Sequence, residues 1–240
     1  TLTDKEDVAH QLRKYDLLAL PVLDTDGLLV GIVTFDDAMD VMVEEATEDI
    51  TKMAAVSPSE KTYFEVSAWE HAKRRIPWLL VLMFSSIITG TIITRYEDAF
   101  AAIPLLVSFI PMLMDTGGNC GSQSSTLIIR GIALNQVTFH DFFRVIWKEF
   151  RVSLIVGVVL AVANGLRIYL TYQQAGMAVV IALSLVATVI SAKLLGCILP
   201  MCAKKIGLDP ALMASPLITT IVDASSIMIY FFIATKVFRL

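Results

Sequence analysis

Long uncharged runs fill the later two thirds of the chain and predict helices that cross a membrane. The first run, Ile76 to Thr94, has nineteen residues without a charge, enough for one helical span of a hydrocarbon core about 30 Å thick. Four more apolar stretches follow, and the expected spans are residues 76–94, 99–130, 151–172, 176–200 and 210–235. The second stretch is long for one straight span, so we expect a broken or steeply tilted helix there.

The first fifty residues follow a different pattern. Residues 17–34 read as two short apolar strands around the turn Asp-Thr-Asp-Gly, and a helix is expected to begin at Phe35–Asp37, with acids in its first turn favoured by the helix dipole. We therefore expect three regions. These are a small α/β piece running into an acidic helix (1–50), a connecting helix or linker (51–75) and a membrane domain (76–240).

Composition agrees with a membrane protein and narrows the alternatives. Hydrophobic residues make up 56% of the chain, charged residues 18%, and the mean hydropathy is +0.70, above that of most soluble globular proteins. This excludes a disordered chain, a secreted disulfide scaffold and a soluble nucleic-acid-binding protein. The chain opens on charged residues, so no signal peptide is expected. The three cysteines, Cys120, Cys197 and Cys202, are expected to be packing residues.

Charge is distributed unevenly and predicts the orientation in the membrane. Residues 1–75 hold sixteen acids and eight bases, whereas residues 76–240 hold seven acids and eleven bases. Nine bases fall on the side of the membrane that carries the N-terminal piece and four on the other side. Because cytoplasmic loops are enriched in Lys and Arg, we expect a cytoplasmic N-terminus and a C-terminus outside. Lys193, near one end of its span, is expected to extend to the cytoplasmic interface.

An acidic run follows the two strands. Seven like charges in fourteen residues repel one another on a helix, so a solvated acidic face is the ordinary interpretation but some neutralising partner is expected. Divalent cations, which prefer clustered carboxylate oxygens, are one candidate, and a basic partner surface is the other. The seven acids are Asp36, Asp37, Asp40, Glu44, Glu45, Glu48 and Asp49.

Asp223 stands near the middle of the last apolar stretch. An ionisable group at that depth is costly unless it faces a polar cavity or a partner. Ser215, Thr219, Asp223 and Ser226 fall on one helical stripe, which is typical of a helix lining a water-filled path. The alternative is a protonated Asp223 bonded to a neighbouring helix.

The segment 111–126 is rich in glycine, amide and hydroxyl side chains within an apolar stretch. Such a composition indicates irregular backbone lining a cavity or a closely packed small-residue interface, and the two interpretations are compatible. Within it, Asp115-Thr116-Gly117 matches the tripeptide of aspartic proteases, but that chemistry needs two carboxylates sharing a proton, and an enzyme is not expected. His10, His71 and His140 are scattered outside the spans.

These motifs together resemble the MgtE family of magnesium transporters. The most specific parts are Pro111-x-Leu with Gly-Gly-Asn-Cys-Gly-Ser-Gln at 117–123, and Asp209-Pro-Ala, Pro216-Leu, Asp223 and Tyr230 in the last span. The pattern Leu-Pro-Val…Asp-Gly…Gly-Ile-Val-Thr-x-x-Asp in residues 20–37 resembles the closing half of a CBS regulatory module. Its opening half is absent, so the chain looks like part of something longer.

The resemblance implies an all-α polytopic membrane protein with five transmembrane helices per subunit, preceded by a partial α/β CBS-module fragment and an acidic connecting helix. It implies a homodimer in the inner membrane, with hydrated Mg²⁺ passing through a pore at the two-fold axis and Asp223 recognising the ion. It further implies two sets of residues. Cytosolic sensing carboxylates would be Asp37, Asp40, Glu45, Glu48, Asp49 and Asp209, and pore-lining residues would be Ser215, Thr219, Gly117, Gly118, Asn119 and Gln123.

Other interpretations stay open at this point. A secondary transporter of Mg²⁺ or Co²⁺ coupled to Na⁺ or H⁺ shares the mid-membrane Asp223. A membrane-anchored CBS receptor is the other class, although a mere anchor has no use for that carboxylate. Thr34-x-x-Asp37 resembles the ribose-contacting end of a CBS nucleotide site, which allows nucleotide binding by the complete module. No nucleic-acid partner is expected, because a basic face is missing.

Overall fold

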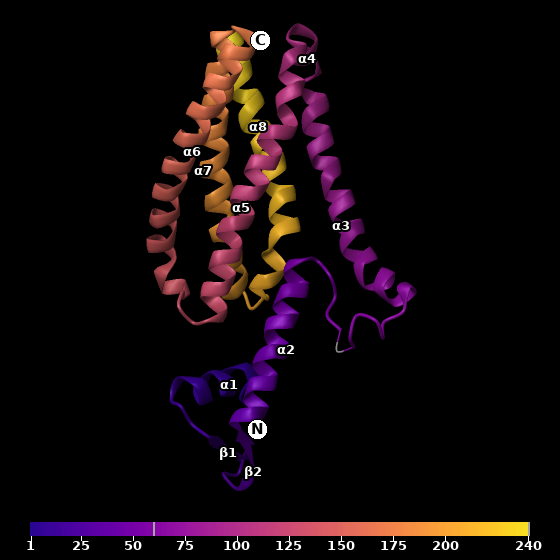
Figure 1. The fold of residues 1–240 in the computed structure, drawn as a ribbon, viewed down its shortest axis with the longest axis vertical. Helices are drawn as coiled ribbons and strands as arrows, with labels where there is room; N and C mark the ends of the chain where they lie inside the picture. The colour runs from indigo at the N-terminus through magenta and orange to yellow at the C-terminus, as the bar shows by residue number, and fades with distance from the viewer. Residues whose placement is uncertain (60, 240) are drawn as a thin grey trace.

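The computed structural model describes residues 1–59 and 61–239, and the side chains of all of these except Phe100 and Ser215. A small N-terminal part lies at one end of a long helical domain (Figure 1). The chain enters that domain through α2, and the loops that join α5 to α6 and α7 to α8 lie at the same end (Figure 1). This arrangement brings the acidic helix next to the membrane domain.

The N-terminal part contains two helices and one hairpin. Helix α1 (Lys5–Lys14) precedes strands β1 (Ala19–Leu23) and β2 (Leu29–Thr34), which pair antiparallel, and α2 (Phe35–Met53) follows directly. The turn forms because the Asp24 carboxylate accepts hydrogen bonds from two backbone amides of the same loop, as Asp does in turns. The two strands and the helix starting at Phe35 confirm the sequence prediction for this region.

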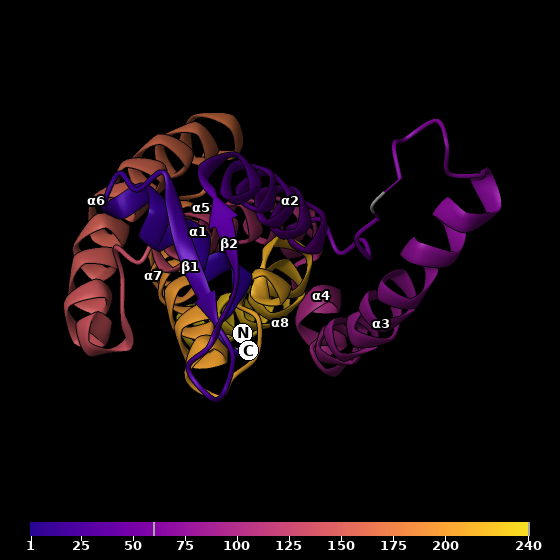
Figure 2. The ribbon, with the colours of Figure 1, turned by 90° about the horizontal axis from the view of Figure 1, so that it is seen from below.

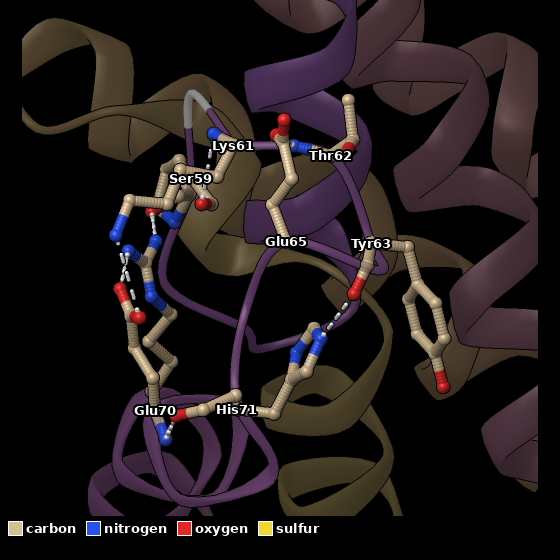
Figure 3. A network of polar contacts seen from close by, with 10 residues as sticks. Ser59, Lys61, Thr62, Tyr63, Glu65, Glu70 and His71 are labelled. Atoms are coloured by element: carbon tan, nitrogen blue, oxygen red, sulfur yellow. Dashed lines mark hydrogen bonds and ion pairs between the residues drawn. The ribbon is translucent and has the colours of Figure 1, made fainter.

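Helix α3 (Ala68–Arg95) begins eight residues before its uncharged run. Its N-cap Ser67 accepts from the Glu70 amide at 3.2 Å, which satisfies one of the free donors of the first turn. The preceding segment is fastened to this start (Figure 3): His71 bonds the Tyr63 carbonyl at 3.2 Å, and Glu70 pairs with Lys61 at 3.6 Å. Arg74, on the second turn, also pairs with Glu70 and donates to the Pro58 carbonyl. The segment between α2 and α3 is thus held on the first two turns of α3.

Further helices and 3₁₀ turns complete the domain. Short helix α4 (Glu97–Ala102) and the 3₁₀ turn η1 (Pro104–Phe109) lead into α5 (Ile110–Ala133), and η2 (Phe139–Asp141) leads into α6 (Phe142–Tyr172). Helix α7 (Ala175–Lys205) is followed by the 3₁₀ turn η3 (Pro210–Met213) and by α8 (Ser215–Phe238). Among the described residues, four helical segments have the length and apolar character needed to cross a membrane: 68–95, 139–172, 175–205 and 210–238.

Helix α5 runs alongside these but is less apolar. It is one continuous helix across the glycine-rich segment, so irregular backbone within residues 111–126 is not observed and the closely packed alternative holds. The break predicted for this stretch occurs earlier, at Ile103, where the backbone leaves the helical region with φ −137° and ψ 83°. Tyr230 of α8 donates to the Leu106 carbonyl at 2.9 Å and so holds the turn that follows the break.

The bundle proper consists of α5, α6, α7 and α8, while α3 stands to one side (Figures 1 and 2). Helix α7 contacts α5, α6 and α8, whereas α3 packs mainly on α8. Only 6% of the apolar window of α3 is buried within the subunit, against 50% for α7. Almost the whole surface of α3 is therefore available to lipid or to another protein.

Candidate ion pathway and cytosolic acidic pocket

Helix α8 carries Asp223 near its middle, and the opposing backbone belongs to α5. A methyl group added at Gly118 would lie 3.0 Å from the Thr219 Cγ2 and 3.9 Å from the Asp223 Oδ1. Gly118 therefore lets the two helices approach closely beside the carboxylate. Asp223 is half-buried, and within the described part of the chain no basic side chain pairs with it.

Helix α5 presents a polar face. Asp115, Asn119 and Gln123 recur every four residues and are all exposed in the single subunit, as expected for one face of a helix. Asp115 is three residues before Gly118 on α5, and Gly118 lies against Asp223, so the two carboxylates belong to neighbouring turns at the α5–α8 contact. No role in an ion pathway was predicted for Asp115, because it lies 108 residues from Asp223 and only the fold brings them together.

Two glycines predicted to line a pore lie inside the helix packing. Gly117 and Gly118 are buried, and a methyl group at Gly117 would approach the Ser226 Oγ to 2.7 Å and Val222 Cγ1 to 2.9 Å. Both glycines face α8, and their role in the subunit is close approach of helices.

The hydroxyl groups of α8 are mostly bonded to their own helix. Thr219 donates to the Pro216 carbonyl at 2.9 Å, and Ser226 donates to the Val222 carbonyl at 2.6 Å. Ser226 is buried at 1% exposure, so it does not continue the partly exposed stripe that Thr219 and Asp223 begin. The Ser215 side chain lies outside the described residues.

Lys193 of α7 does not extend to the interface, contrary to the prediction from the sequence. It is only 5% exposed and donates to Ser124 of α5 at 3.4 Å. Ser124 in turn donates to Glu149 of α6 at 2.7 Å. The prediction was wrong because these partners, 69 and 44 residues away along the chain, are brought to Lys193 only by the bundle.

A polar cavity of about 360 Å³ opens where α2 meets the end of the bundle. Asp209 joins the two: its Oδ1 accepts from the Ala211 amide at 2.8 Å and its Oδ2 accepts from Lys52 at 2.6 Å. Lys52 also pairs with Glu48 on its own helix. The ionisable side chains that line the cavity are Glu6, Glu45, Asp49, Lys52, Lys204 and Asp209.

The electrostatics of this cavity shift two pKa values. Burial, followed by the negative charges of Asp209 and Glu6, raises the pKa of Asp49 to about 6. Burial lowers the pKa of Lys52, but its hydrogen bonds to Asp209 and Glu48 outweigh this effect and raise the pKa above its ordinary value. Lys52 is therefore charged at neutral pH, and Asp49 is the carboxyl that gains a proton most readily on acidification.

The predicted sensing carboxylates are divided between two places. Glu45, Glu48, Asp49 and Asp209 lie around the cavity or beside its lysine, whereas Asp37 and Asp40 are exposed at the far end of α2. Asp37 accepts from the Thr34 hydroxyl at 2.7 Å in a capping box. Across residues 1–59 and 61–239, no three His, Cys, Asp or Glu side chains converge closely enough to hold a metal ion.

Internal lysines neutralise part of the acidic run. Lys5 of α1 pairs with Glu45 at 3.1 Å and with Glu44 at 3.7 Å. Lys52 forms the ion pair with Glu48 described above. Neither lysine was identified from the sequence. The i,i+4 spacing of Glu48 and Lys52 was a signal that could have identified one of them.

Comparison with known proteins identifies two regions. The family model described as MgtE, divalent cation transporter, matches residues 110–233, and the CBS domain model matches residues 3–44. The first match covers α5 to α8 except the last residues of α8, which includes Asp223 and the helices that surround it. The second covers α1, the hairpin and the first half of α2.

Three curated proteins are similar over almost the whole chain. The magnesium transporter MgtE of Bacillus subtilis is 40% identical over 234 residues, and that of Thermus thermophilus is 39% identical over 234 residues. The magnesium transporter MgtE of Enterococcus faecalis is 35% identical over 236 residues. Each alignment covers 98% of this chain but 51%, 52% and 51% of the respective relative. The chain thus spans about half the length of the curated relatives it matches, and all three carry the name of a transporter and not of an enzyme.

Proposed function

The chain belongs to the MgtE family of divalent cation transporters, and from this premise we propose that it conducts Mg²⁺ through a homodimeric pore lined by α8. The observation that carries the proposal is the position of Asp223. It is a half-buried carboxylate on a membrane helix, next to glycine backbone and to a second carboxylate, Asp115. Intramembrane carboxylates of this kind mark ion pathways by default.

The chemistry of Mg²⁺ supports one carboxylate per subunit. Mg²⁺ loses its water reluctantly and is usually bound through several waters and one or two carboxylates. A dimer places two copies of Asp223 at its axis, which attract a hydrated divalent ion and repel anions. The exposed polar face of α5, with Asn119 and Gln123, offers hydrogen-bonding partners for the waters of the ion.

The membrane topology in this proposal has five spans. Helix α5 joins the four most apolar helices because its 24 residues rise about 36 Å, longer than the hydrocarbon core. The basic loops and the N-terminal part lie at the same end of the domain (Figure 1), which supports a cytoplasmic N-terminus and an outside C-terminus in a bacterial inner membrane. The regions are residues 1–50 (CBS fragment and acidic helix), 51–75 (connection) and 76–240 (pore domain).

Gating is proposed to use the acidic cavity between α2 and the bundle. Glu45, Glu48, Asp49 and Asp209 do not converge on a direct coordination site among the described residues, so cytosolic Mg²⁺ would be held through its own waters. An ion held in this way would keep α2 against η3 and favour the closed state. The ion must bind the closed state better than the open one, or it shifts nothing. Asp37 and Asp40, at the far end of α2, would bind Mg²⁺ only in the complete CBS assembly. The same assembly would bind a nucleotide near Thr34 and Asp37.

The experiment that tests the proposal is Mg²⁺ influx into dye-loaded liposomes, comparing the parent chain with Asp223→Asn. We expect influx in the parent and loss in the variant with the dimer intact. Equal influx in both would move the selective site away from Asp223. No influx in either protein would contradict conduction by this chain.

The same liposomes discriminate between a channel and a coupled carrier. Under the proposal, influx follows the Mg²⁺ gradient and the membrane potential alone. Influx that requires an imposed Na⁺ or H⁺ gradient would favour the secondary transporter. A membrane-anchored receptor would show no Asp223-dependent flux under either condition.

A further inference from the structure

Lys193, Ser124 and Glu149 form a polar chain across three helices, in which Lys193 and Ser124 are buried and Glu149 is partly exposed. The Ser124 hydroxyl on α5 donates to the Glu149 Oε2 on α6 at 2.7 Å and accepts from the Lys193 Nζ on α7 at 3.4 Å. The single hydroxyl hydrogen is used toward the carboxylate and a lone pair is used toward the ammonium, so the donor and acceptor roles are consistent. One serine thus stands between a positive and a negative side chain.

The Lys193 and Ser124 side chains lie well inside the bundle. Twelve residues separate Lys193 from Lys205 at the end of α7, which is about 18 Å of helix and beyond the reach of a lysine side chain. Ser124 is 1% exposed and Lys193 is 5% exposed. Because a buried charge is strongly unfavourable unless it is paired and hydrogen-bonded, the Lys193 ammonium depends on Ser124 and, through that hydroxyl, on Glu149.

At the same level of the bundle, α5 and α7 approach each other closely. A methyl group added at Gly196 would collide with the Gly121 carbonyl oxygen and lie 3.1 Å from the Ser124 Cβ. On its other side, Gly121 faces α8, where an added methyl group would lie 2.8 Å from Ile218 Cγ2. Glycine contacts allow close approach but are smooth, so they do not by themselves resist sliding of one helix along another.

We propose that the bridge formed by Lys193, Ser124 and Glu149 fixes the axial position of α5 and so aligns its polar face with Asp223. Ser124 is one residue beyond Gln123 and two turns beyond Gly117, so a shift of α5 at the bridge moves Asp115 and Asn119 by the same distance. These three are positioning residues, and this inference rests on the proposed ion pathway. The bridge determines the spacing between the α5 carboxylate and the α8 carboxylate, and through it the affinity for the ion.

Transport kinetics in liposomes test the inference with Ser124→Ala, Lys193→Met, Lys193→Arg and the double variant Lys193→Met/Glu149→Gln. We expect Ser124→Ala and Lys193→Met to raise the half-saturating Mg²⁺ concentration about threefold or more, as for groups coupled in one network. Lys193→Arg retains the charge and should remain near the parent. The double variant should be no worse than Lys193→Met alone, because it removes both charges together.

The matched control is Ser153→Ala. Ser153 of α6 is as buried as Ser124, but its hydroxyl donates only to the Phe150 carbonyl of its own helix. It should leave half-saturation unchanged. If Ser124→Ala and Lys193→Met lower only the maximal rate, in proportion to the folded protein, the bridge merely stabilises the bundle and the inference is wrong. A double variant with a higher half-saturating Mg²⁺ concentration than Lys193→Met alone would also overturn it.

A readout independent of transport separates this inference from the proposed function. Asn119→Cys, in a chain whose Cys120, Cys197 and Cys202 are changed to Ser, reports the position of the α5 face through its rate of thiol labelling. We expect Lys193→Met to change that rate and Ser153→Ala not to change it. If Lys193→Met changes the labelling rate but the protein conducts no Mg²⁺, the inference stands and the proposed function is rejected. If the labelling rate is unchanged in a protein that conducts Mg²⁺, the proposed function stands and the inference is rejected.

Discussion

Asp209 serves two neighbours with its two oxygens. Oδ1 caps the turn η3 through the Ala211 amide, and Oδ2 holds Lys52 of the acidic helix. The carboxylate thus links the turn before α8 to the acidic helix. Its negative charge is also one of the causes, after burial, of the raised pKa of the neighbouring Asp49.

The raised pKa of Asp49, about 6, predicts a pH-dependent attachment of α2 to the bundle. The folded protein binds a proton here between about pH 6 and the ordinary range of a free aspartate, whereas the unfolded chain does not. The contribution of Asp49 to stability is therefore least favourable above pH 6 and improves as the pH falls through 6. We expect protease cleavage of residues 54–67 to slow between pH 7 and pH 5, after correction for the activity of the protease.

Two variants check the source of this pH effect. Asp49→Asn should abolish the part of the pH dependence that appears near pH 6. Asp40→Asn removes an exposed carboxylate from the same helix and should retain it. Identical pH profiles for all three proteins would show that another group controls the attachment.

At the scale of elements, the membrane bundle depends on glycines where helices cross. Gly196 of α7 has no room for a side chain, because the Gly121 carbonyl and the Ser124 Cβ lie against it. Gly90 of α3 has nothing within 4 Å of an added methyl group. These two glycines occupy helices of similar length but opposite surroundings.

We predict that Gly196→Ala destabilises the bundle by about 1–3 kcal/mol, the usual effect of overpacking. Gly90→Ala should be neutral or slightly stabilising, since alanine favours the helix over glycine by up to about 1 kcal/mol. Thermal unfolding of the detergent-solubilised variants measures both. A Gly196→Ala protein as stable as the parent would mean that α5 and α7 can separate without loss.

How far these elements could be predicted from the sequence depends on the range of the interactions. The hairpin and the start of α2 at Phe35 follow from local signals, namely the Asp-Thr-Asp-Gly turn and the acids of the first turn. The continuity of α5 through its glycines could not be predicted, because the stabilising contacts come from α7 and α8. Lys193 was misplaced for the same reason: its partners are distant in sequence.

The candidate site divides in the same way. Asp223 was identified from its depth in an apolar stretch, which is a property of the sequence alone. Its nearness to Asp115, and the inward orientation of Gly117 and Ser226, depend on the rotation of α5 and α8 about their axes. An isolated helical stripe does not specify which neighbour it faces, so Ser226 was assigned to the pathway although it is buried in the packing.

At the scale of the molecule, an ion pair and the packing of Met53 on Ala211 and Ala214 join the N-terminal part to the loop between α7 and α8. Lys52 and Asp209 are 157 residues apart, and their side chains are 23% and 31% exposed. A pair with this exposure contributes about 1 kcal/mol or less. This ion pair is therefore weak enough for a bound cation to replace it.

We predict that Lys52→Met weakens attachment without Mg²⁺ but lowers the Mg²⁺ concentration needed for it, because the ammonium no longer competes with the ion for Glu48 and Asp209. Protection of residues 54–67 from protease at increasing Mg²⁺ measures this. Lys14→Met is the control, since Lys14 of α1 is exposed and lies over the Tyr15 ring, away from the carboxylates of the cavity. Equal Mg²⁺ requirements for the Lys52 variant and the parent would contradict the competition.

The isolation of α3 has a consequence for biogenesis. The ribosome delivers α3 to the translocon before α5, α7 and α8 exist, and its nearly uncovered apolar surface lets it rest in lipid alone. Helix α5 differs, since its glycines find their packing partners only after α7 and α8 have been synthesised. We therefore expect membrane insertion in stages: α3 can insert on its own, and α5 is stabilised only after α7 and α8 have been synthesised.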